Sequence, residues 1–170
     1  TPSWLQDTLS SMPYSNLKER IETRGSWYRC DVQQQDVSTY ISTFCLDDFS
    51  YYQQHLYGEV VLGKDSAQFS FLTEYQWQSL NDLILNLRKD GLVLRNITIG
   101  QEHYDVVEAL EKKSSELVDK EVILLINRYP QETIRSLFWV KPDEFSSPSP
   151  SLNVELHSDG EIIDVKVTRF

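Results

Sequence analysis

Residues 152–167 read LNVELHSDGEIIDVKV and carry the clearest fold signal in the chain. Two strand-like segments, Leu152 to Leu156 and Ile162 to Val167, are joined through residues 157–161. The Asp159-Gly160 pair in this connection favours a tight turn, because its backbone twist suits two paired antiparallel strands. We therefore expect a C-terminal β-hairpin.

The best helix signal lies at residues 73–91. Thr73 and Gln76 have the spacing of a capping box, and Asp90-Gly91 supplies a stop signal. Between them runs one apolar stripe at helical spacing, formed by Trp77, Leu80, Leu83, Ile84 and Leu87. A second helix is expected from Glu102 to Asp119.

Other segments are expected to be strands because they are β-branched, aromatic or alternating. These are residues 27–32, 37–46, 59–62, 68–72, 92–99 and 137–140, with 59–62 and 68–72 forming a hairpin through Gly63 to Ser66. The apolar run Val122 to Ile126 suits a buried strand or an extension of the preceding helix. Short helices are expected within residues 4–23, 47–57 and 130–136, although 47–57 could instead be an irregular aromatic loop.

Together these elements predict one α+β domain over residues 1–170. Its largely antiparallel sheet would pack against two main helices and end in the hairpin. Residues 146–151, SSPSPS, are expected to form a flexible Ser/Pro loop inside this domain.

The charge balance restricts the classes of partner. With 26 acidic and 16 basic residues the net charge is -10. Affinity for nucleic acid comes mainly from Lys and Arg, so direct nucleic-acid binding is not expected, and neither is docking on anionic lipid. No apolar run approaches the roughly 20 residues that span a bilayer.

The two cysteines, Cys30 and Cys45, are too few for a disulfide scaffold. Both a bridge and free thiols are compatible with the sequence. We expect buried free thiols and a cytoplasmic location, because thiols stay reduced in that compartment.

Strong catalytic motifs are missing from the sequence. The three histidines, His55, His103 and His157, lie far apart and have no metal-binding spacing. No GxSxG, Walker A or GxGxxG motif occurs, so nucleotide-dependent chemistry is not expected. We therefore expect no cofactor, apart from the alternative described next.

Pro142-Asp143 followed by Asp164-Val165-Lys166 resembles the PD-(D/E)xK arrangement of metal-dependent nucleases. The resemblance implies that Asp143 and Asp164 would bind a divalent metal, Mg²⁺ or Mn²⁺, and that Lys166 would be the catalytic amine. A hard cation prefers oxygen ligands and lowers the pKa of its bound water. The chain stops four residues after Lys166, where this family usually continues.

One stretch, Cys30 to Gly63, contains no lysine or arginine but five carboxylates and six aromatic rings. Tyrosines are common in the cores of protein interfaces, and carboxylates around them would pair with Lys or Arg of a partner. The residues that we expect to bind a partner are Asp47, Asp48, Tyr51, Tyr52, Tyr57 and Glu59.

The sequence thus favours a non-enzymatic, acidic protein-binding module that engages a basic partner surface. An adaptor, an inhibitor or an immunity-type protein would fit this description, and its function would be regulatory. Two alternatives stay open, a PD-(D/E)xK-type nuclease and a small-molecule sensor with an aromatic pocket.

Overall fold

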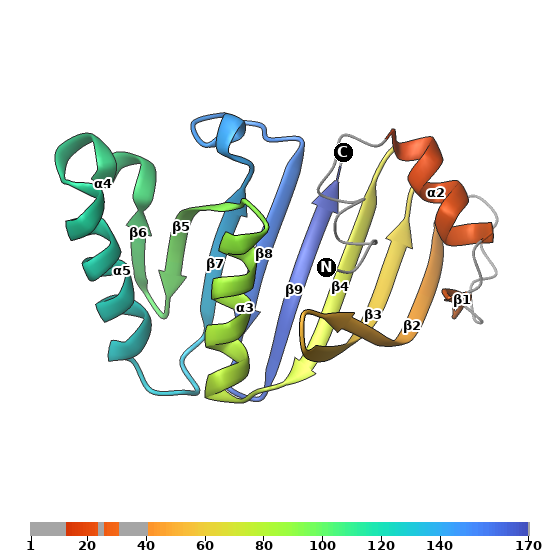
Figure 1. Cartoon of the computed structure of the whole chain (residues 1–170), viewed down its shortest axis with the longest axis horizontal. Coiled ribbons are helices and arrows are strands. Elements are labelled where there is room, and N and C mark those ends of the chain that lie inside the picture. The colour runs from red at the N-terminus through yellow and green to blue at the C-terminus, as the bar shows by residue number, and fades with distance from the viewer. Residues whose placement is uncertain (1–12, 24–25, 31–40, 170) are drawn as a thin grey trace. The chain divides into compact units, whose positions relative to one another are not determined.

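The structure is a computed structural model, which describes residues 13–23, 26–30 and 41–169 (Figure 1). Its described residues contain four α-helices and nine strands, so the α+β class and the antiparallel pairing predicted from the sequence are confirmed. The chain divides into two compact units, one of residues 1–73 and 165–170 and one of residues 74–164. One domain over residues 1–170 stays a prediction.

The first unit contains one described helix and four strands in the order β1-β2-β3-β4. The elements are α2 (Tyr14–Thr23), β1 (Tyr28–Arg29), β2 (Ser42–Tyr51), β3 (Gln54–Leu62) and β4 (Ala67–Glu74). Strand β9 (Ile162–Arg169) contributes its residues from Val165 onward to this unit. The expected hairpin through Gly63 to Ser66 is confirmed by the antiparallel pairing of β3 and β4.

The core of the first unit lies on one face of these strands. Alternate residues of β2, β3 and β4 point into it, among them Phe44, Val60 and Phe69, which the register places in one row. Leu17 and Ile21 of α2 are fully buried as well. Because Gly58 has no side chain, the Trp27 ring can pack closely against its backbone. A Cβ at position 58 would lie only 3.1 Å from Cη2 of this ring.

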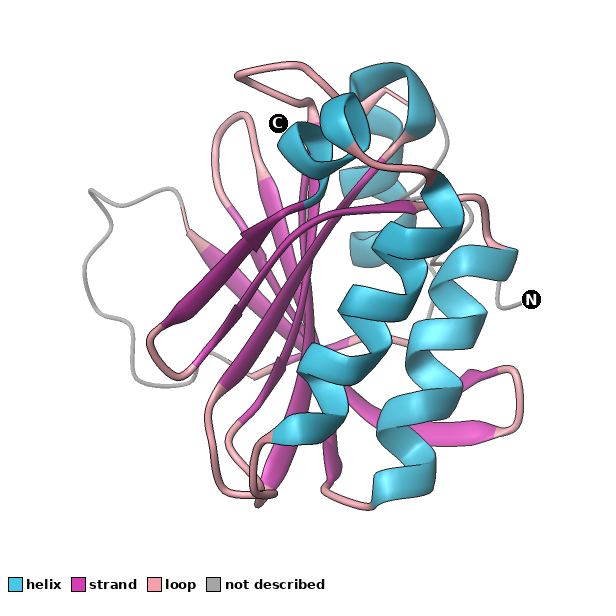
Figure 2. Ribbon diagram, turned by 90° about the vertical axis from the view of Figure 1, so that its left-hand side faces the viewer, coloured by secondary structure: helices cyan, strands magenta, loops and turns pink. Residues whose placement is uncertain are grey.

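The second unit contains three helices and five strands, the last of which is the start of β9. The elements are α3 (Trp77–Lys89), β5 (Val93–Ile99), β6 (Glu102–Asp105), α4 (Val106–Lys112), α5 (Ser115–Arg128), β7 (Arg135–Val140), the 3₁₀ turn η1 (Pro142–Glu144) and β8 (Leu152–Ser158). Its strand order is β8-β7-β5-β6. Helices α3 and α5 lie on the same face of these strands (Figures 1 and 2).

Helix α3 buries most of the predicted stripe, since Leu80, Leu83 and Leu87 are fully buried, but Trp77 at its start is 47% exposed. The expected capping box is wrong: β4 continues through Glu74, and the N-cap is Gln76, which makes no side-chain cap hydrogen bond. The C-terminal hairpin is confirmed, with Gly160 in the turn at a φ of 89°.

The expected helix over residues 47–57 is wrong, because these residues complete β2 and begin β3. A bulge interrupts the pairing between Leu46 and Phe49, so Asp47 and Asp48 are both exposed in succession. This extra residue breaks the two-residue alternation by which a strand is recognised. Tyr52, at a φ of 55°, turns the chain into β3.

The expected second helix is wrong as a single element, and the expected helix over 130–136 is wrong as well. Of the two alternatives for residues 122–126, the strand is wrong and the helical one is confirmed. Residues 102–119 hold β6, α4 and the start of α5, with Asp105 and Ser114 as N-caps. The apolar run belongs to α5: Val122 and Ile126 are buried, whereas Leu124 is 68% exposed. Residues 130–134 form a turn before β7.

Arg135, the first residue of β7, explains this turn. Its side chain is only 2% exposed, and no carboxylate among the described residues pairs with it. Its guanidinium instead donates hydrogen bonds to the backbone oxygens of Ile126, Tyr129, Pro130, Gln131 and Thr133. The last turn of α5 carries partial negative charge, so this buried cation stabilises both the helix end and the turn.

Cys30 and Cys45 form a disulfide, so the expectation of free thiols is wrong. Tyr28 pairs with Cys45, and the backbone N–H of Cys30 donates to the carbonyl oxygen of Thr43 at 3.0 Å. The bridge therefore lies diagonally across the β1–β2 pair. Fifteen residues separate the two cysteines, and the sequence alone does not reveal that they meet.

Candidate functional site

Four side chains on the outer face of the first unit form what we call the acidic–tyrosine face: Tyr28, Asp47, Tyr57 and Glu59. The register places Tyr28, Cys45 and Glu59 in one row across β1, β2 and β3. Their strand neighbours Phe44 and Val60 point to the opposite face and are buried. The strands thus separate a packed inner face from this polar outer face.

Tyr28 and Asp47 are joined by a short hydrogen bond. The Tyr28 hydroxyl donates to Asp47 Oδ1 at 2.6 Å, and the Tyr28 residue is 47% exposed. This hydrogen bond, followed by loss of hydration and the charge of Asp47, raises the pKa of Tyr28 to about 12. Near neutral pH the hydroxyl is therefore a donor, and the ring is held against the carboxylate.

Tyr57 is the second ring of the face and is 38% exposed. Partial burial raises the pKa of its hydroxyl, and the negative charges of Glu59 and Asp47 raise it further. Among the described residues, neither Asp47 nor Glu59 pairs with a lysine or arginine. The face therefore combines two accessible rings with two carboxylates, and no described lysine or arginine neutralises the charge of these carboxylates.

The other expected partner-binding residues lie around the β2–β3 turn. Asp48 Oδ1 lies 2.9 Å from His55 Nδ1, and both side chains are mostly exposed. Tyr52 is partly exposed in the turn, and its ring meets the Tyr51 ring edge to face at 5.0 Å. Tyr51 is only 2% exposed, so its expected exposure is wrong, and its ring belongs to the core.

Sequence reasoning missed Tyr28 and His55. Tyr28 lies outside the lysine- and arginine-free stretch and reaches it only through the pairing of β1 with β2. His55 belongs to the stretch, but the turn at Tyr52-Gln53 brings it opposite Ser50 and close to Asp48. A predicted β-hairpin over residues 47–57 would have placed His55 near Asp48.

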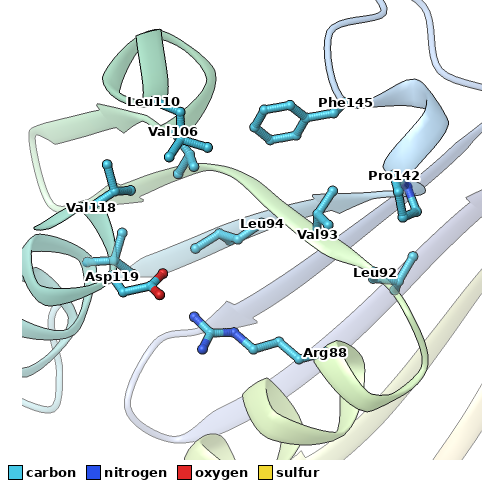
Figure 3. Close-up of a pocket in the computed structure, with 11 residues that line it drawn as sticks. Arg88, Leu92, Val93, Leu94, Val106, Leu110, Val118, Asp119, Pro142 and Phe145 are labelled. Atoms are coloured by element: carbon cyan, nitrogen blue, oxygen red, sulfur yellow. The ribbon is translucent and has the colours of Figure 1, made fainter. Parts of the chain in front are cut away.

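A second candidate site is an apolar pocket of about 490 Å³ in the second unit (Figure 3). It is lined by Leu92, Val93 and Leu94 near the start of β5, by residues of α4 and α5, and by Pro142 and Phe145. Phe145 is its only aromatic ring among the described residues, so this is not the aromatic pocket expected of a sensor. Arg88 and Asp119 line one side of the pocket and point toward one another (Figure 3).

A third polar cluster lies on β7 and β8. Ser136 Oγ is 2.9 Å from His157 Nδ1 and 3.2 Å from Glu155 Oε2, while Glu155 Oε2 is 3.4 Å from the same ring nitrogen. In a serine–histidine–acid relay the hydroxyl and the acid contact different ring nitrogens. Because both groups meet Nδ1 here, the cluster does not have the geometry of that relay.

The structure does not bring the two nuclease carboxylates together. Asp143 lies in η1, beyond the end of β7 that is distant from the β8–β9 turn, whereas Asp164 follows that turn directly (Figure 1). Lys166 is two residues farther along β9. Within the described part of the chain, no group of three His, Cys, Asp or Glu side chains could hold a metal ion.

No helix that the structure describes is both long and apolar enough to cross a lipid bilayer. Comparison with known proteins finds no matching family model, no matching curated protein and no matching solved structure. The geometry of the chain's own residues is therefore the basis for a functional proposal.

Proposed function

We propose that this chain is a non-enzymatic binding module that engages a basic protein surface through the acidic–tyrosine face. One observation carries the proposal: two accessible tyrosines lie beside two carboxylates that pair with no described cation. Tyrosine is enriched at interfaces and among the residues that carry most of the binding energy, because its ring can be buried while its hydroxyl keeps a hydrogen-bond partner. Roles as an adaptor, an inhibitor or an immunity-type protein all fit this mode of binding.

The mechanism has two parts. The net charge of -10 attracts a basic partner over a distance and raises the rate of encounter. On contact, an arginine can pair with Asp47 or Glu59 while its guanidinium stacks on a tyrosine ring. The Tyr28–Asp47 hydrogen bond holds both groups before binding, which lowers the entropy lost on association.

Charge reversal tests the proposal with an arginine-rich peptide as the probe. We expect the double variant Asp47→Lys, Glu59→Lys, which reverses both carboxylates of the face, to weaken peptide binding by about tenfold or more, as measured by NMR titration. In the wild type, the first signals to shift should be those of Tyr28 and Tyr57.

The matched control is the double variant Asp65→Lys, Asp143→Lys, which has the same net charge but changes exposed residues of the β3–β4 turn and η1. It should retain most of the affinity. Equal weakening by both double variants would show that net charge alone attracts the peptide, and the acidic–tyrosine face would then lose its role.

The disulfide bears on where the protein works. The expected cytoplasmic location rested on free thiols, whereas disulfides persist mainly in oxidising compartments. The cytoplasmic location therefore stays a prediction, but the disulfide removes the argument on which it rested. Thiol trapping in intact cells measures whether Cys30 and Cys45 are bridged where the protein accumulates.

A further inference from the structure

The pocket of the second unit has an apolar body. Its floor consists of Val93 and Leu94 of β5, and its walls include Val106 of α4 and Val118 of α5 (Figure 3). Phe145 lies across from these walls. A volume of about 490 Å³ is within the usual range of small-molecule sites, which are mostly apolar with a few placed polar groups.

The pocket also has one polar side, formed by Arg88 of α3 and Asp119 of α5 (Figure 3). The two side chains point toward one another, yet they form no ion pair with each other. Neither makes a side-chain hydrogen bond or ion pair with any other residue that the structure describes. A donor and an acceptor are thus presented side by side with a space between them.

This pair selects the head group of a ligand. A carboxylate would attract Arg88 but meet repulsion from Asp119, and an ammonium group would meet the opposite problem. An amide satisfies both, since its oxygen accepts from Arg88 and its N–H donates to Asp119. A zwitterion also matches the charges, but it needs two separate charged groups at the end of the ligand, whereas an amide supplies the acceptor and the donor in one group.

We propose that this pocket binds a small amphiphile with an aliphatic body and an amide head held between Arg88 and Asp119. The body contacts Leu94, Val106 and Phe145, where it displaces water from apolar surface. Direct closure of Arg88 onto Asp119 competes little, because ion pairs between exposed side chains contribute little free energy. The proposal is independent of the acidic–tyrosine face, which belongs to the other unit.

Three probes with the same chain test the head group: octanamide, octanoate and octylammonium, each below its micelle concentration. Binding is measured by calorimetry and by NMR shifts of pocket residues. We expect the wild type to bind octanamide about tenfold more tightly than either charged probe. Octanoate should gain affinity in Asp119→Asn, and octylammonium should gain affinity in Arg88→Gln.

A second pair of variants tests the apolar body. Leu110 lines the pocket, whereas Leu124 lies on α5 outside it, and both side chains are exposed. Leu110→Trp should fill the pocket and lower octanamide affinity by about tenfold, whereas Leu124→Trp should leave it unchanged. Circular dichroism checks that both variants fold, and a misfolded Leu110→Trp is replaced by Leu110→Phe.

Three results would overturn the proposal: no binding of octanamide, a charged probe that binds the wild type as tightly as the amide, or equal losses from the two tryptophan variants.

Discussion

At the scale of single residues, Gly160 has the least room for a side chain among the described glycines. Its φ is 89°, and a Cβ there would lie 2.7 Å from Glu132 Cα and 2.8 Å from Gln131 O. Gln131 Nε2 also donates to the Gly160 carbonyl oxygen at 3.0 Å, so the turns before β7 and β9 pack closely. The predicted Asp-Gly turn thus has a second function in packing.

We expect Gly160→Ala to lower the free energy of unfolding by more than Gly91→Ala. Both glycines have a φ near 90°, but no atom lies within 4 Å of a Cβ at Gly91. Gly91→Ala should cost about 1–2 kcal/mol from backbone strain alone. Gly160→Ala should cost about 1–3 kcal/mol more because its Cβ overlaps backbone. Urea denaturation measures both, and equal losses would show that the overlap relaxes freely.

At the scale of elements, the disulfide holds β1 against β2. Strand β1 has only two residues, and its Tyr28 completes the acidic–tyrosine face. We expect the double variant Cys30→Ser, Cys45→Ser to lose about 3 kcal/mol of unfolding free energy, because a bridge over 15 residues restricts the unfolded chain. Urea denaturation measures the loss.

The same variant should return the Tyr28 titration toward an ordinary tyrosine pKa, because β1 would no longer hold the hydroxyl against Asp47. Absorbance of tyrosinate above pH 10 follows this change, with Tyr28→Phe identifying the transition. A reducing agent should destabilise the wild type and leave the double variant unchanged. Equal stability of oxidised and reduced wild type would contradict the account.

At the scale of the whole molecule, pH should control stability through carboxylates of the second unit. Hydrogen bonds from Lys113 and Tyr104 lower the pKa of Glu121, and backbone hydrogen bonds from Ile162 and Glu161 lower that of Asp159. A carboxylate whose pKa is lowered by folding stabilises the folded state at pH values above its pKa in the unfolded chain. This contribution is lost as the pH falls through the pKa of the folded state. Unfolding free energy should therefore decline below about pH 4.5.

Glu121→Gln and Asp159→Asn should each flatten this decline, as measured by urea denaturation between pH 2 and 7. Glu111→Gln is the control, because exposed Glu111 makes no hydrogen bond or ion pair with the described residues. An unchanged slope in both test variants would assign the acid sensitivity to other groups.

Part of the candidate site was visible in the sequence. Asp47, Tyr57 and Glu59 stand out because their stretch has no lysine or arginine, and Asp47 and Tyr57 are exposed in the structure. Tyr51 could not be separated from them, since the bulge after Leu46 changes which residues point inward. A bulge depends on the partner strand and leaves little trace in one sequence.

By itself the sequence determined the features that arise from neighbouring residues. The Asp-Gly hairpin, the buried stripe of α3 and the acidic stretch each depend on a pattern within one turn, one helix or one continuous segment. Only the tertiary structure decided which residues of separate segments lie together: Tyr28 beside Asp47, Cys30 bridged to Cys45, and Arg88 facing Asp119. Strand register and helix packing place these pairs, and both result from burying apolar surface contributed by the whole chain rather than by any local pattern.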